Sequence, residues 1–167
     1  MRFVHAALAC SSNPGSSGSS ASSVPNLYML EEVIDRETEG PFRKYINNAS
    51  AVTLALEDPE DQERADFLTF VQHYQMLKSH GTLFVSDYQG GSSLLIDPQI
   101  MTSPKALDSR LFADGNIGKG FESFHTDHIC NHFCNFFELG DDFKAGLPSK
   151  MAEDIDGEKS MSISVAE

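Results

Sequence analysis

The pattern His128-x-Cys130-x-x-x-Cys134 places two of the three cysteines of the chain four residues apart, with a histidine two residues before the first of them. On a helix, Cys130 and Cys134 would project from one face, and His128 would lie at the start of that helix. Two thiolates and one imidazole are three of the four ligands that a tetrahedral zinc ion takes in proteins. The fourth ligand must come from elsewhere, and histidine is the expected type. The candidates are His5, His73, His80, His125 and His132.

The two cysteines also have a simpler interpretation, because free cysteines are commonly buried in apolar cores. They would then fill an apolar helix face together with Phe133, Phe136 and Phe137. The third cysteine, Cys10, makes the number odd and leaves no disulfide framework. This cysteine usage is typical of the cytosol or nucleus, and we expect a cytoplasmic protein.

Composition limits the possible partners. The chain has 167 residues, of which 40% are hydrophobic, and this suffices for one domain with an ordinary core. Its formal net charge is −13, whereas nucleic acids and anionic membranes are bound by basic surfaces. We therefore expect neither nucleic acid nor a membrane as a partner. No run of about 18 apolar residues is present, so no membrane span is expected.

The chain is expected to have three parts. Residues 11–23 are rich in Ser and Gly, a composition typical of a flexible linker. Residues 27–30 favour a short strand, and the acidic, Ser- and Met-rich residues from Pro148 onward favour disorder. The expected parts are an N-terminal piece with the linker (1–26), a folded lobe (27–145) and an acidic disordered tail (146–167).

The acidic run Glu57-Asp58-Pro59-Glu60-Asp61 predicts the start of a long helix, because carboxylates stabilise a helix N-terminus. We expect this run to be solvated. Apolar residues recur after it at helical spacing, and Gly81 ends the pattern. The residues expected to face the core are Phe67, Phe70, Val71, Tyr74 and Leu77.

A hairpin is predicted next. Residues 82–87 have the pattern of a buried strand, residues 88–91 that of a turn, and residues 93–96 that of a second strand. In this arrangement Asp87 and Asp97 stand at the ends of the two arms.

Gln89 follows Asp87 by two residues, so its side chain would point to the same side of this hairpin. Two carboxylates and an amide oxygen are the hard ligands that Mg²⁺ prefers, and a bound Mg²⁺ would suit a nucleotide-dependent phosphoryl transfer. The alternative is that Asp87 and Asp97 are ordinary turn residues, since Asp before Pro98 is a frequent turn start.

Three glycines, at 115, 118 and 120, precede a helix expected to carry Phe121, Phe124, His128 and Phe136. Backbone N–H groups of such a segment can bind an anion at the helix start. The alternative is a simple turn.

Taken in order, these segments resemble the catalytic lobe of the alpha-kinase family of atypical serine/threonine protein kinases. Residues 87–90 and 97–99 are similar to its Asp-x-Gln-Gly and Asp-Pro-Gln motifs. Residues 112–118 resemble its Phe-Gly-x-Gly-Asn-Leu-Gly loop, and residues 128–134 resemble its His-x-Cys-Asn-x-x-Cys zinc motif. The resemblance covers roughly residues 27 to 140.

The resemblance implies an α+β fold, the protein-kinase-like C-terminal lobe of an alpha-kinase, with most of the N-terminal lobe missing. It implies that Asp87 is the catalytic or metal-binding aspartate and that Gln89 is a metal ligand. Asp97 would be a metal ligand or an acid/base partner. ATP and Mg²⁺ would be required.

Further roles follow from the same resemblance. Residues 42–48 are similar to a Lys-Tyr-Asn-Asn loop beneath the nucleotide, which implies contacts from Lys44 and Asn47. Residues 27–32 are similar to the hinge that borders adenine, which implicates Glu31. The implied substrate loop contains Gly115, Asn116 and Gly118.

The resemblance also names the fourth zinc ligand, because the histidine of the family before the aspartate strand falls on His73. The implied set is His73, His128, Cys130 and Cys134. Four protein ligands would make the zinc ion structural rather than hydrolytic.

The expected function is transfer of the γ-phosphoryl group of Mg-ATP to a serine or threonine hydroxyl of a protein substrate. The chain departs from the family pattern in four respects. Ile96 replaces a threonine, Ala113 replaces a glycine, and Ile46 interrupts the Asn run. In addition, residues 1–26 would hold only a remnant of the lobe that carries a phosphate-pairing lysine. The alternative is a truncated, catalytically impaired kinase lobe, stabilised by zinc, that acts as a binding module.

Overall fold

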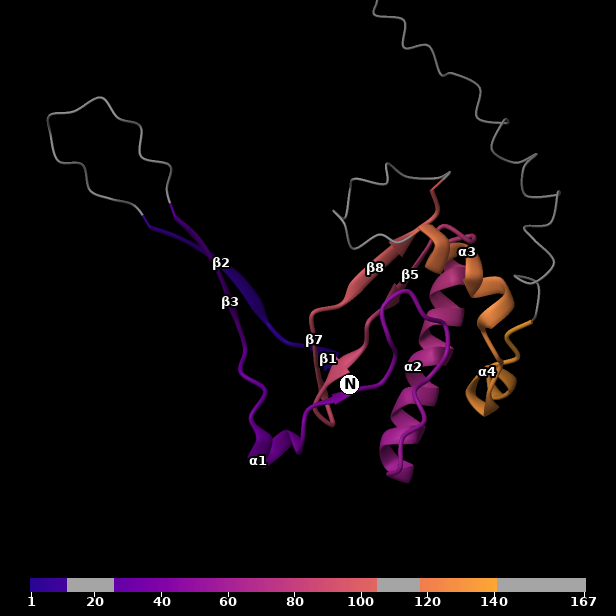
Figure 1. Ribbon diagram of the computed structural model, residues 1–167, viewed down its shortest axis with the longest axis horizontal. Helices are drawn as coiled ribbons and strands as arrows, with labels where there is room; N and C mark the ends of the chain where they lie inside the picture. Colours follow the sequence, from indigo (N-terminus) through magenta and orange to yellow (C-terminus); the bar gives the residue numbers. More distant parts are fainter. Residues whose placement is uncertain (12–25, 105–117, 141–167) are drawn as a thin grey trace, which may run out of the picture.

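The computed structural model describes residues 1–11, 26–104 and 118–140 (Figure 1). The helices are α1 (Arg36–Glu39), α2 (Pro59–Lys78), α3 (Gly118–Asp127) and α4 (His132–Phe136). The strands are β1 (Arg2–Phe3), β2 (Ala6–Cys10), β3 (Leu27–Glu31), β4 (Arg43–Lys44), β5 (Leu83–Ser86), β6 (Gln89–Gly90), β7 (Leu94–Ile96) and β8 (Gln99–Thr102). The α+β class predicted from the sequence is confirmed. The expected tail and most of the linker lie outside the described residues.

The strands form three small sheets. The largest has the order β1-β7-β6-β4, in which β1 runs parallel to β7 and the other pairs are antiparallel. Strands β2 and β3 form a separate antiparallel ladder, which projects away from the helices in Figure 1. Both N-terminal strands thus pair with segments of the expected 27–145 lobe. The expected boundary at residue 26 stays a prediction.

Helix α2 begins where the acidic run predicted. Asp58 is the N-cap, and its side chain accepts hydrogen bonds from the backbone N–H groups of Glu60 and Asp61, while Pro59 occupies the first turn. The expectation that the whole run is solvated is wrong for Asp61, whose side chain is buried and ion-paired with Arg43 and with Arg64. Within the described ranges, no helix is long and apolar enough to cross a bilayer.

The predicted core face of α2 is right for Phe70, which is buried, and wrong for Phe67 and Tyr74, which are 37% and 45% exposed. Val71 and Leu77 are half-buried. Gln72 and His73, which were not predicted to face the core, are fully buried. The reason lies in hydrogen bonds between the helix and strand β5. Gln72 Nε2 donates to the carbonyl of Val85 at 2.9 Å, and Gln75 Oε1 accepts from the N–H of Val85 at 2.9 Å. Because buried backbone groups must be paired, polar side chains occupy the buried face of the helix here.

Two hydrophobic clusters form the core, and α2 contributes to both. The first contains Ala51, Met76, Phe84, Met101, Phe121 and Phe124. The second contains Tyr45, Ile46, Ala65, Leu68, Tyr88 and Leu95. Figure 1 shows α2 between strand β5 and helix α4. Met76 of α2 belongs to the first cluster, and Ala65 and Leu68 of the same helix belong to the second, so one helix covers both.

The predicted hairpin is present in a different form. Strand β5 pairs with β8 and not with the 93–96 strand, which pairs with β6 across a turn at residues 91–93. Both arms are interrupted at an aspartate with left-handed backbone, Asp87 at φ 58° and Asp97 at φ 53°. Aspartate adopts this conformation more readily than most residues, so each arm changes direction there and resumes as a second strand.

The single helix expected from Phe121 to Phe136 is also wrong, because the chain leaves α3 after Asp127 and starts α4 at His132. Asn131 causes the break. Its Oδ1 atom accepts from the N–H groups of Phe133 and Cys134, as an N-cap does, while its Nδ2 atom donates to the carbonyl of Asp66 on α2 at 2.7 Å.

Arg2 and Glu32 tie β1 to the end of the β2–β3 ladder. The guanidinium donates to both carboxylate oxygens, at 2.7 and 2.8 Å, and the N–H of His5 donates to Glu32 at 3.0 Å. The hydrogen bond from Arg2 is the main cause that lowers the pKa of Glu32 from 4.5 to about 2. The contribution of Glu32 to stability is therefore fully present above the ordinary pKa and is lost as the pH falls through the lowered one.

We expect an NMR titration of the Glu32 side-chain carboxyl to give a midpoint near 2 rather than near 4.5. Replacement Arg2→Gln should move the midpoint back toward the ordinary value, because the main stabilising donor is removed. A midpoint near 4.5 in the unmodified chain would contradict the contact.

Candidate catalytic and metal sites

The two aspartates predicted from the sequence lie at equivalent positions along the two arms of the hairpin. Asp87 separates β5 from β6, and Asp97 separates β7 from β8. Because β5 pairs with β8 and β6 pairs with β7, the two interruptions lie across from each other. Asp87 is 7% exposed, whereas Asp97 is solvent-exposed. Gln89 is the first residue of β6, so it lies between Asp87 and the β6–β7 turn.

Lys44 lies beside Asp87. It pairs in register with Gln89 across β4 and β6, and its Nζ atom is 2.5 Å from Asp87 Oδ1. The same ammonium donates to Asn48 Oδ1 at 2.9 Å. One lysine therefore balances the charge of the largely buried carboxylate and is itself held by the Asn-rich segment.

Asn47 reaches this region through its backbone. Its carbonyl accepts a hydrogen bond from Ser86 Oγ at 2.9 Å, and its side chain is exposed. Ser86 is fully buried and also donates to the carbonyl of Ser50 at 3.1 Å. Sequence reasoning missed Ser86. Its position directly before Asp87 at the end of a buried strand was the available signal.

Tyr88 was also missed. Its ring is 2% exposed, and burial raises the pKa of its hydroxyl to about 12, so the side chain is neutral at pH 7. Its carbonyl accepts hydrogen bonds from the N–H groups of Tyr45 and Ile46 at 2.8 and 3.2 Å. The backbone after Asp87 is thereby fixed to the segment that follows Lys44.

The remaining predicted site residues are placed elsewhere. Glu31 is exposed at the end of β3, in the β2–β3 ladder, which shares no strand with the sheet of Gln89. Gly118 is the first residue of α3 rather than part of a preceding loop. Gly115 and Asn116 lie outside the described residues.

The four predicted metal ligands come together. One ligand atom from each of His73, His128, Cys130 and Cys134 can be chosen so that all four lie within 4.8 Å of one another. Cys130 Sγ is 3.8 Å from His73 Nδ1, and Cys134 Sγ is 3.9 Å from His128 Nε2. Zinc–sulfur bonds of about 2.3 Å and zinc–nitrogen bonds of about 2.0–2.1 Å at tetrahedral angles give sulfur–nitrogen separations of about 3.6 Å. The donor set and its geometry fit a tetrahedral ion.

The arrangement around these ligands differs from the single helix predicted. Cys130 lies in the connection between α3 and α4, and Cys134 lies in α4. His73 comes from α2, and its Nε2 atom is 3.2 Å from the carbonyl of Gly140. Donation from Nε2–H to that carbonyl would leave Nδ1 for a metal. Of the histidines that spacing left open, His73 is the one that the fold brings to the cysteines.

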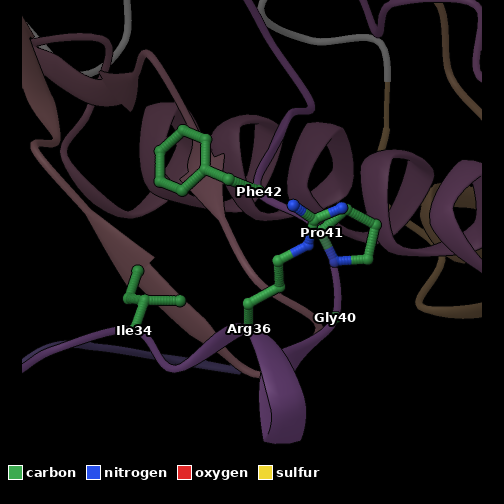
Figure 2. A pocket seen from close by; sticks show the side chains of 5 residues that line it. All are labelled: Ile34, Arg36, Gly40, Pro41 and Phe42. Atoms are coloured by element: carbon green, nitrogen blue, oxygen red, sulfur yellow. The ribbon is translucent and has the colours of Figure 1, made fainter.

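A surface pocket of about 380 Å³ lies beside α1 and is lined by Ile34, Arg36, Gly40, Pro41 and Phe42 (Figure 2). Figure 2 shows the Arg36 side chain next to Pro41, with Ile34 and Phe42 at other parts of the wall. The lining shares no residue with the predicted catalytic or metal sites.

Residues 2–134 match the family model described as the alpha-kinase family. The chain is 36% identical over 114 residues to eukaryotic elongation factor 2 kinase of Mus musculus, which covers 68% of this chain and 14% of the relative. It is 33% identical over 108 residues to myosin heavy chain kinase A of Dictyostelium discoideum, covering 64% of this chain and 8% of the relative. The chain thus spans a small part of the length of these relatives.

Solved structures give the same family. The alpha-kinase domain of myosin heavy chain kinase A in complex with AMP matches with a TM-score of 0.56 and 28% identity, over 83% of this chain and 48% of that one. The inactive domain in complex with ATP matches with a TM-score of 0.56 and 26% identity, over 83% of this chain and 47% of that one.

Gly120 gives a stability test of the packing next to the site. A Cβ atom at this position would lie 2.2 Å from Ala49 Cβ and 2.8 Å from the Ala49 carbonyl oxygen. We expect Gly120→Ala to destabilise the fold by about 1–3 kcal/mol through overpacking, despite the better helix propensity of alanine. Chemical denaturation measures the change.

Gly118→Ala is the matched control on the same helix, because among the described residues its Cβ would meet only Pro104 Cγ, at 3.4 Å. That variant should be tolerated. Equal stability of the two variants would show that α3 does not pack closely on Ala49.

Proposed function

The chain belongs to the alpha-kinase family, and we propose that it acts in an ATP-dependent serine/threonine protein kinase, with transfer of the γ-phosphoryl group of Mg-ATP to a protein hydroxyl. The observation that carries the proposal is the placement of Asp87 and Asp97 at facing interruptions of one hairpin, with Gln89 beside them. The solved relatives described in complex with AMP and with ATP support a nucleotide ligand.

Asp87, Gln89 and Asp97 would hold Mg²⁺ through two carboxylates and one amide oxygen, the ligand types that this ion prefers. When bound, Mg²⁺ neutralises phosphate charge and orients the phosphoryl group. The left-handed backbone of Asp87 and of Asp97 changes the direction of each arm at facing positions of the hairpin. This geometry supports a shared site for their side chains.

Lys44 would supply positive charge close to the nucleotide phosphates while it orients Asp87. Its contacts with Asp87 and Asn48 fix the ammonium in the described structure. The proposed nucleotide contacts of Asn47 and Glu31 rest on the family resemblance, as does the proposed substrate loop of Gly115, Asn116 and Gly118.

The transfer forms a bond between the acceptor hydroxyl oxygen and the γ-phosphorus and breaks the bond to the bridging oxygen of ADP. The hydroxyl proton must pass to a base in this step. A carboxylate of Asp87 or Asp97 is the proposed acceptor, because both lie at the hairpin interruption. Positioning and charge neutralisation provide most of the rate in such reactions.

We also propose a structural Zn²⁺ ion held by His73, His128, Cys130 and Cys134. The support is the convergence of four donors from α2, from the α3–α4 connection and from α4. Four protein ligands leave no open position for water, which argues against a zinc hydrolase. The ion would join α2 to the last described segment of the chain.

We expect metal analysis of the purified chain to give one zinc per molecule. Cys134→Ser should lower the free energy of unfolding by several kcal/mol, because a structural metal contributes its binding energy to folding. Cys10→Ser is the control, since Cys10 is exposed and distant in sequence from the cluster. Purified protein with no zinc at all would disprove the site.

The kinase proposal predicts that nucleotide binding requires Mg²⁺ and is lost in Asp87→Ala. Asp87→Asn should be used beside it, because asparagine tolerates the left-handed backbone and so separates lost chemistry from strain. Isothermal titration with ATP, with and without Mg²⁺, measures the effect, and Glu57→Ala is a control for loss of one exposed carboxylate.

Zinc content and folding should be unchanged in the Asp87 variants. Binding that is independent of both Mg²⁺ and Asp87 would contradict the proposal. A folded, zinc-containing chain that binds no nucleotide would favour the alternative, a binding module.

A further inference from the structure

Glu39, the last residue of α1, has a buried carboxylate that faces a turn distant in sequence. It accepts hydrogen bonds from the N–H of Ser93 at 2.7 Å, from Ser93 Oγ at 2.5 Å and from the N–H of Leu94 at 3.0 Å. Its side chain is 9% exposed. In addition, the backbone carbonyl of Glu39 accepts from the N–H of Ser92 at 2.9 Å. One residue therefore holds Ser92 and Ser93 of the β6–β7 turn and Leu94, the first residue of β7.

The turn is shaped to receive this residue. A Cβ atom at Gly91 would lie 2.5 Å from Glu39 Cβ, and one at Gly90 would lie 2.1 Å from the carbonyl oxygen of Leu94. Gly90 also has a φ of 153°, which other residues rarely adopt. On the other side, the Tyr45 hydroxyl donates to the carbonyl of Gly91 at 2.7 Å. Gly91 thus allows α1 to approach the turn closely, and Gly90 allows β6 to approach the backbone of β7.

The charge of the carboxylate matches these donors. The hydroxyl and the N–H of Ser93 hold the pKa of Glu39 below its ordinary value, so the group is ionised at neutral pH. A glutamine at this position would turn an amide NH₂ toward N–H donors or accept with one oxygen only. Replacement of the charge would thus weaken the contact without removing volume.

The turn sets the relative position of two proposed magnesium ligands. Gln89 pairs with Ile96 across β6 and β7, and Asp97 follows Ile96 directly. A slip of one residue between these strands would send each side chain to the opposite face of the sheet. The strands are short, with two and three residues, so their own ladder specifies register weakly.

We propose that Glu39 is a positioning residue, which fixes the β6–β7 register and thereby aligns Gln89 with Asp97 for the divalent cation. This role rests on the proposed function, because the cation belongs to that site. Glu39 acts through the turn and touches neither the cation nor the substrate.

The test compares the full zinc-containing chain with Glu39→Gln and with Glu37→Gln. Glu37 is the matched control, since it lies on the same short helix, carries the same charge and is exposed. Mn²⁺ alone is titrated and free Mn²⁺ is followed by EPR. The backbone amide resonances of Gln89 and Asp97 are recorded in parallel by NMR.

We expect Glu39→Gln to weaken Mn²⁺ binding by about 10-fold or more, the range seen when supporting contacts of a metal site are removed. The resonances of Gln89 and Asp97 should shift, whereas zinc content and the resonances of α2 should not. Glu37→Gln should match the unmodified chain. If Glu39→Gln does not fold, Ser93→Ala removes one donor and should weaken Mn²⁺ binding in the same direction.

Mn²⁺ binding in Glu39→Gln that equals that of the unmodified chain would overturn the proposal. If the unmodified chain binds no Mn²⁺, the proposed kinase function fails separately, and the NMR measurement decides about Glu39. Unshifted Gln89 and Asp97 resonances would then disprove the positioning role, and shifts confined to the hairpin would support it.

Discussion

The hydrogen bonds between α2 and Val85 hold the structure in its arrangement. Gln72 and Gln75 use side-chain amides to pair both backbone groups of Val85, so the helix lies against β5 in one fixed position. A purely apolar contact would permit sliding, whereas an unpaired buried backbone group would be costly. β5 leads directly to Asp87, and His73 is the neighbour of Gln72 on the helix. The proposed catalytic and zinc sites are therefore positioned by the same contact.

The hairpin needs support from three directions because its strands are short. α2 fixes β5, the segment after β4 holds Tyr88 through backbone hydrogen bonds, and Glu39 holds the turn. Each of these contacts is a hydrogen bond between polar groups. Where strands are short, side-chain hydrogen bonds to the backbone carry much of the specificity that long ladders provide elsewhere.

The sequence allowed the elements to be predicted better than their pairing. Acidic capping and helical spacing located α2, but periodicity of apolar residues could not show that Gln72 would be buried, since that depends on the unpaired backbone of Val85. The strands of the hairpin arms were predicted correctly. However, the left-handed backbone of Asp87 and Asp97 depends on tertiary contacts, which residue spacing does not reveal. Asn131 is of a residue type that caps helices, but the apolar spacing of residues 121–136 does not predict a break there. The fourth metal ligand followed from family resemblance, because spacing alone left five histidines open.

The pairing of β1 with β7 has a consequence for synthesis of the chain. Arg2 lies beside Leu94 in the sheet, so during synthesis β1 must wait until residue 94 has been made before its partner strand exists. At about 5–20 residues per second, this interval lasts several seconds or longer. Contacts between residues so far apart in sequence form slowly during folding. Until β7 is present, the backbone groups of β1 are free to pair with other strands. The bidentate contact of Arg2 with Glu32 can form much earlier, and it would keep β1 near the end of the β2–β3 ladder while β7 is still being made.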